Sequence, residues 1–119
     1  MTALERTQAC LDHIERHNEK INAFITVMSD QALDDAAKID AKMESGDWSG
    51  LLAGMPISIK DCIDVAGVPC TNGTLFYQDY VPNQDAPIVR ALRQAGAVIL
   101  GKTNLHEFCY GATTQNPHY

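Results

Sequence analysis

Basic residues are scarce in this 119-residue chain. Nine lysines and arginines stand against fifteen aspartates and glutamates, giving a net charge of −6, and the basic residues form no run. Nucleic acids and anionic lipids are bound by basic clusters, so we expect neither as a partner. The chain also lacks an apolar run of the ~18 residues that a membrane span needs, and it shows no secretory signal pattern at its start. The sequence therefore predicts no membrane association and a cytoplasmic location.

Closely spaced cysteines are also missing. The four cysteines are Cys10, Cys62, Cys70 and Cys109. They form neither a CxxC pair nor a zinc-ribbon spacing, so we expect four free thiols. His13 and His17 lie one helical turn apart, but Ile14 occupies the place where a zinc-protease helix carries its glutamate. We therefore expect no metal and no cofactor.

Hydrophobic periodicity predicts helices that alternate with short strands. Apolar residues recur at helical spacing over residues 2–19 and again over residues 29–46, and a β-prone run lies between them. A third helix is expected to start at Asp85 as its cap, with Ile88 facing inward, and to lead directly into an apolar strand at residues 97–100. A helix followed at once by a buried strand is an α/β unit, and its parallel sheet needs cover on both faces.

One strand delivers a lysine at a conspicuous place. Gly54 and Pro56 form a turn that leads into two isoleucines alternating with Ser58 and Lys60. Period-2 geometry places Ser58 and Lys60 together on the face opposite the isoleucines. If both faces of the sheet are covered, Lys60 is a buried amine, and desolvation favours the neutral form that a general base requires. The next residue, Asp61, is expected to be a strand-end carboxylate bonded to the backbone.

A second lysine lies in a misleading motif. Residues 96–103 read Gly-Ala-Val-Ile-Leu-Gly-Lys-Thr and match the letters of the phosphate-binding pattern GxxxxGK[ST]. A phosphate loop follows a strand and leads into a helix at its lysine. Here the first glycine follows a helix, and the four intervening residues are apolar strand formers. We therefore expect Lys102 to lie in or beside a strand and not at a nucleotide.

Several linked segments together resemble the amidase signature family. The segment Gly-Met-Pro-Ile-Ser-Ile-Lys-Asp at residues 54–61 is similar to the lysine motif of that family. The resemblance extends to Ile-Asn-Ala-Phe-Ile at residues 21–25 and to the stretch from residue 85 to residue 108, including Gly-Lys-Thr-Asn. It covers essentially the whole chain, and ordered motifs of this kind are more specific than the lysine segment alone.

The resemblance implies a fold and a chemistry. We expect α/β architecture: a partial three-layer α/β/α arrangement with a mixed, partly parallel sheet, as the N-terminal piece of the family fold. The expected domain is single and truncated, with a helical part (1–46), a lysine strand and loop region (47–84) and a helix-strand-helix unit (85–111). The family hydrolyses carboxamides with a Ser, cis-Ser and Lys triad and needs no cofactor. By position, Lys60 is its catalytic base, and Cys109, Tyr110 and Gly111 lie beside the acyl pocket.

The family's serines are absent from these 119 residues. In the family, a Gly-Gly-Ser-Ser-Gly-Gly-Ser segment carries both serines some tens of residues beyond the region that resembles residues 116–119. The serines present are Ser29, Ser45, Ser49 and Ser58, none of them in a glycine-rich turn. We therefore expect a piece of an amidase that is inactive alone, with a small amide as substrate only in a full-length protein.

Two alternatives stay open at this point. The first is a naturally short, self-associating interaction module or inactive relic of an amidase, forming a homo-oligomer through exposed sheet edges. The second is an unrelated α/β domain in which Lys60 is a structural residue at a strand end.

Overall fold

A computed structural model describes residues 1–47 and 50–119, so Ser49 lies outside the described residues. The elements in chain order are α1 (Ala3–Ile21), β1 (Phe24–Val27), α2 (Ser29–Glu44), β2 (Pro56–Lys60), α3 (Pro87–Ala95) and β3 (Val98–Thr103). Two short 3₁₀ turns are η1 (Leu75–Tyr77) and η2 (Glu107–Cys109). Within these ranges, no helix combines the length and hydropathy needed to cross a bilayer.

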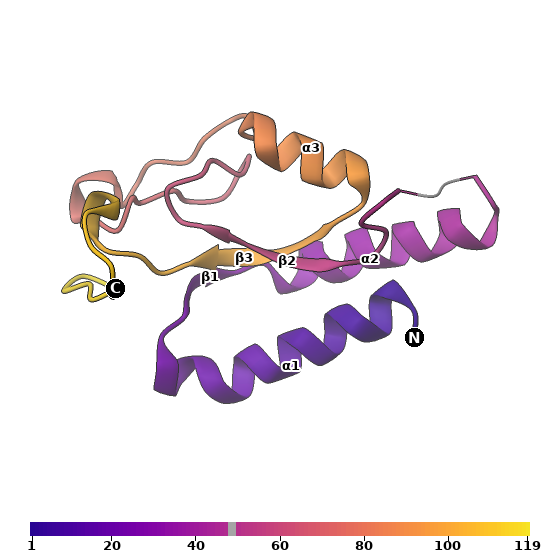
Figure 1. Ribbon diagram of the computed structural model, residues 1–119, viewed down its shortest axis with the longest axis horizontal. Helices are drawn as coiled ribbons and strands as arrows, with labels where there is room; N and C mark the ends of the chain where they lie inside the picture. The colour runs from indigo at the N-terminus through magenta and orange to yellow at the C-terminus, as the bar shows by residue number, and fades with distance from the viewer. Residues whose placement is uncertain (48–49) are drawn as a thin grey trace.

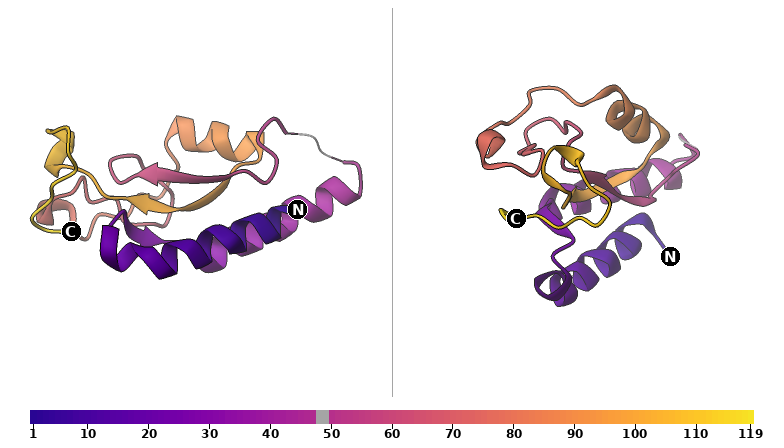
Figure 2. Two further views of the ribbon diagram at one scale, coloured as in Figure 1. Left: turned by 60° about the horizontal axis from the view of Figure 1, so that its bottom comes forward. Right: turned by 60° about the vertical axis from the view of Figure 1, so that its left-hand side comes forward.

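The three strands form one mixed sheet between two layers. Its order is β1-β3-β2, with β3 antiparallel to β1 and parallel to β2. Helices α1 and α2 lie on one side of the sheet, and α3 lies on the other with the long connection between β2 and α3 (Figures 1 and 2). The expectation of a partial three-layer α/β/α fold with a mixed sheet is confirmed.

The start of α1 is fastened to α2. Thr2 and Glu5 form a reciprocal capping box, in which each side chain accepts a hydrogen bond from the other residue's amide. From α2, the carboxylate of Asp40 accepts the amides of Ala3 and Leu4 at 2.7 and 2.9 Å. A negative charge at a helix N-terminus is favourable, and this one also fixes how the two helices pack.

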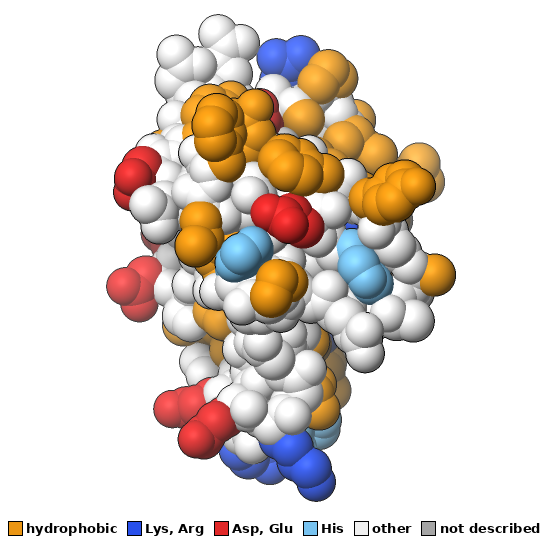
Figure 3. Space-filling view, turned by 90° about the vertical axis from the view of Figure 1, so that its left-hand side faces the viewer, with side chains coloured by type: hydrophobic (Ala, Val, Ile, Leu, Met, Phe, Trp, Pro, Cys, Tyr) orange, Lys and Arg blue, Asp and Glu red, His pale blue; other side chains and the backbone are white. Residues whose placement is uncertain are grey.

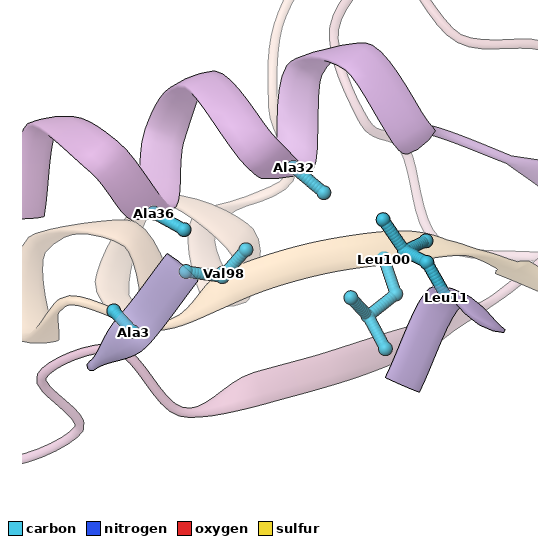
Figure 4. Packing of buried hydrophobic residues seen from close by; sticks show 6 residues of the cluster. All are labelled: Ala3, Leu11, Ala32, Ala36, Val98 and Leu100. Carbon is cyan, nitrogen blue, oxygen red and sulfur yellow. The ribbon is translucent and has the colours of Figure 1, made fainter. Parts of the chain in front are cut away.

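Small side chains let the helix layer approach the sheet closely. The buried cluster on this side consists of Ala3, Leu11, Ala32, Ala36, Val98 and Leu100 (Figure 4). Ala32 and Ala36, one turn apart on α2, are fully buried. An alanine stripe on a helix gives little side-chain bulk, so α2 lies close against β3 and the longer side chains of α1 fill the remaining space.

The opposite layer has its own core, built on α3 and the loop. Its members are Met28, Ile59, Val65, Val68, Val89 and Ile99. The inward residue of α3 is Val89, while Ile88 is 56% exposed, so the predicted orientation of this helix was wrong by one position. The predicted cap was also wrong: Ala86 occupies the cap position, and Asp85 instead accepts hydrogen bonds from the Ala66 amide and from Arg93.

A bulge in β3 decides which of its side chains face which layer. Ile57 of β2 is paired with Ile99, but the next residue, Ser58, is paired with Gly101, so Leu100 is the extra residue. A bulge reverses the alternation of side chains beyond it. Val98 and Leu100 therefore belong to the helix layer, whereas Lys102 lies on the same side as Ile99.

Candidate functional site

Lys60 is the last residue of β2, opposite Thr103 of the central strand. Burial alternates along β2: Ile59 is buried, and Ser58 and Lys60 are exposed. The shared face of Ser58 and Lys60 therefore agrees with the prediction, but the amine is not buried. The reason is that α1 and α2 pack on each other and on β3, leaving this face of the edge strand open to solvent.

Directly behind Lys60, Asp61 and Lys102 form a buried ion pair. Both side chains are essentially inaccessible, and the Lys102 Nζ lies 2.8 Å from the Asp61 Oδ1. The other carboxylate oxygen accepts hydrogen bonds from the amide and the hydroxyl of Thr71, the amide at 3.0 Å. Lys102 also donates to the carbonyl of Pro69 at 3.3 Å. Two charges in the interior are tolerated only when they are paired and hydrogen-bonded in this way.

The backbone of Asp61 is held as firmly as its side chain. Its amide donates to the carbonyl of Thr103 at 3.0 Å, and its carbonyl accepts the amide of Asn72 at 2.9 Å. The Cys70 thiol lies within 3.6 Å of the same carbonyl. These contacts fix the end of β2, and with it the backbone position from which Lys60 extends.

The sequence indicated half of this arrangement. Asp61 is bonded to a backbone amide as expected, but its partnership with Lys102 was missed. The available signal was the lysine of the Gly-Lys-Thr motif, a charged residue at the end of an apolar strand. The structure places Lys102 within β3, where a phosphate loop would begin a helix, so the motif serves the interior of the sheet.

Cys70 is not a candidate nucleophile. Burial is the main cause that raises the pKa of its thiol to about 11, although the nearby Lys102 acts in the opposite direction. A thiol with such a pKa is protonated at neutral pH, and only the thiolate is reactive.

The residues predicted for the acyl pocket lie in and after η2. Cys109 is exposed and lies beside Cys62, the second residue after Lys60. Gly111 packs against the ring of His106, and the side chain of Tyr110 is 91% exposed. The structure thus brings Cys109 to the end of β2, whereas Tyr110 faces solvent.

An open hollow of about 640 Å³ lies beside this end of the sheet. Cys62 and Asn72 line it on one side and the rings of Tyr77 and Tyr80 on another. It is large enough for a small organic molecule. Across residues 1–47 and 50–119, His, Cys, Asp and Glu side chains form no group of three suited to a metal ion.

The comparison with known families decides the ancestry. The profile of the Amidase family matches residues 5–119. The chain belongs to the amidase family. The amidase-like component of the glutamyl-tRNA(Gln) amidotransferase of Trichormus variabilis is 41% identical over 118 residues, which are 99% of this chain and 24% of that protein.

Solved structures of amidases superimpose closely on this chain. The peptide amidase of Stenotrophomonas maltophilia shares 39% identity over 91% of the chain, with a TM-score of 0.85. A protein from a vestigial complex, described as revealing the origins of an s-triazine catabolic enzyme, covers all of it at 34% identity with a TM-score of 0.96. These two matches involve 22% and 26% of the respective proteins. This amidase chain therefore spans about a quarter of the length of its relatives.

Proposed function

We propose that the chain supplies the lysine of an amide-hydrolysing Ser, cis-Ser and Lys site, and that Lys60 is the base. The observation that carries this proposal is the placement of Lys60: it extends from the end of a strand whose next residue is anchored by a buried ion pair. A general base must be held within hydrogen-bond reach of the proton that it takes, and a rigid strand end meets this requirement.

The proposed chemistry needs groups that these 119 residues do not contain. The lysine takes a proton through a bridging serine, the second serine attacks the carboxamide carbon, and backbone amides hold the oxyanion. An amine in water is protonated near neutral pH and cannot accept this proton. Covering the open face of β2 with the serine-bearing part of the family fold would exclude water from Lys60 and supply both serines.

The proposal includes the partners and the location. The substrate is a small carboxamide, bound only when the rest of the family fold is present. The net charge of −6 supports the absence of nucleic-acid and membrane partners. A cytoplasmic location is part of the same proposal.

We expect the purified 119-residue chain to release no ammonia from simple amides such as acetamide and benzamide. The measurement is a coupled ammonia assay over several hours, with Lys60→Ala as the matched variant. Equal background for the two proteins is the expected result, because neither contains the nucleophile. Ammonia release that Lys60→Ala abolishes would contradict the proposed inactivity.

A second candidate function is that of a self-associating module or inactive relic. Two observations favour it. Strands β1 and β2 are both sheet edges with one neighbour each, and apolar side chains gather at the end of the molecule that carries η1 and η2 (Figure 3). Among them Phe76 is 81% exposed and Phe108 58%. Exposed edges and apolar patches favour association with another copy.

Light scattering coupled to size exclusion tests this second function. A concentration-dependent mass of two or more chains is expected if the edges or the apolar end pair with another copy, and Phe76→Ser should weaken association through the apolar end. A monodisperse species at the 13.0 kDa monomer mass would remove the basis for it.

A further inference from the structure

The fold brings two distant cysteines together. Cys62 directly follows Asp61, and Cys109 directly follows Phe108. The backbone of Asn72 joins these two segments: its amide donates to the carbonyl of Asp61 at 2.9 Å, and its carbonyl accepts the amide of Phe108 at 2.8 Å. The end of β2 and the η2 turn are therefore held side by side by one residue.

Aromatic packing holds the η2 turn in the same place. The ring of Phe108 meets the ring of Tyr77 edge-on, with centroids 6.3 Å apart, and Tyr77 also lines the hollow that Cys62 borders. Cys109 has no room to move far, since its amide donates to the carbonyl of His106 within the turn. Its thiol is exposed, and that of Cys62 is partly buried beside it.

The surroundings of the two thiols differ. Burial and the neighbouring Cys109 thiol raise the pKa of Cys62, while Lys60 acts in the opposite direction. The remaining cysteines lie elsewhere: Cys70 is buried against the carbonyl of Asp61, and Cys10 is on α1. Cys62 and Cys109 are thus the pair of thiols in contact, one shielded and one open to reagents.

We propose that Cys62 and Cys109 form an oxidisable dithiol that a peroxide converts to a disulfide. The exposed Cys109 thiolate attacks one peroxide oxygen, the O–O bond breaks, and a sulfenic acid and one water form. The Cys62 sulfur then displaces hydroxide from this sulfenic acid, forming the S–S bond and a second water. The two thiols lose two electrons and two protons, and the peroxide is reduced to two molecules of water.

The disulfide would tie the η2 turn to the strand end that carries Lys60. In the proposed amidase site, this bond lies between the base and the residues predicted beside the acyl pocket. That functional consequence rests on the proposed function. The thiol chemistry does not, because it depends only on the contact between the two cysteines.

The experiment uses the full chain, reduced and then treated with equimolar hydrogen peroxide. We expect the intact mass to fall by two hydrogen atoms, and peptide mapping to recover Cys62 linked to Cys109. The melting temperature should rise by several degrees, because the bond closes a long loop in the unfolded chain. Dithiothreitol should reverse both changes.

Single serine variants provide the matched controls. Cys10→Ser should behave as the parent chain, whereas Cys109→Ser and Cys62→Ser should each abolish the mass loss and the rise in melting temperature. Cys109 is exposed, so its variant keeps the test valid even if Cys62→Ser fails to fold. Linkage between two copies, a bond to Cys10 or Cys70, or stable oxygen addition at Cys109 would each overturn the proposal. An active or inactive outcome in the ammonia assay leaves this result unchanged.

Discussion

Replacing Asp61 by alanine is expected to lower the free energy of unfolding by about 3–5 kcal/mol. The change leaves the Lys102 ammonium buried with only the carbonyl of Pro69 as a partner. It also removes the acceptor for the amide and hydroxyl of Thr71. An uncompensated buried charge is among the costliest defects in a protein interior, and a loss of this size is a large part of the total stability of a small domain.

Urea denaturation followed by circular dichroism measures this loss. The matched control is Asp34→Ala, which removes the carboxylate of an exposed ion pair with Lys38 on α2 and should leave the midpoint nearly unchanged. A double variant, Asp61→Leu with Lys102→Met, replaces both charges by apolar groups and should recover most of the stability. A single Asp61 variant as mild as the control would show that the pair is not a major support.

Gly101→Ala is expected to separate β1 from the sheet. A Cβ at this position would lie 2.2 Å from the carbonyl oxygen of Thr26 and 3.1 Å from the Cα of Val27, both backbone atoms. No side-chain rotation relieves such an overlap, so the two strands must move apart. We expect a loss of about 3 kcal/mol or more, at the upper end for overpacked sites.

Hydrogen exchange locates the damage from this substitution. The amide of Met28, which donates to the carbonyl of Leu100 at 2.8 Å, should exchange much faster in Gly101→Ala than in the parent chain. Gly67→Ala is the control: its φ is +74°, but its Cβ would meet no atom within 4 Å, so only the backbone penalty of about 1–2 kcal/mol applies. Similar exchange rates at Met28 in both variants would contradict the steric explanation.

Local patterns in the sequence predicted the elements of the fold well. The alternation of Ile57 and Ile59 with polar residues identified β2, and the apolar run after Gly96 identified the buried central strand. The resemblance to amidases supplied the layers, because a parallel pair of strands requires cover on both faces. Roles for Lys60 and for the residues after η2 remain predictions that rest on that resemblance.

Long-range features escaped the sequence for physical reasons. A bulge at Leu100 shifts Lys102 to the other side of β3, and strict alternation gives the wrong face for it. The partner Asp61 comes from a different strand end, so no local spacing connects the two charges. Val89 rather than Ile88 faces inward because Asp85, the expected cap, is engaged by Ala66 and Arg93 instead.

The central position of β3 has a consequence for biosynthesis. Strands β1 and β2 are made early, yet both find their only described strand neighbour in β3, which emerges last of the three. Until the ribosome has released residues 98–103, the nascent chain has helices but no sheet on which to pack them. Ribosome stalling before that point would expose two unpaired strands to chaperones and proteases, so the translation rate through this stretch controls how long the nascent chain stays vulnerable.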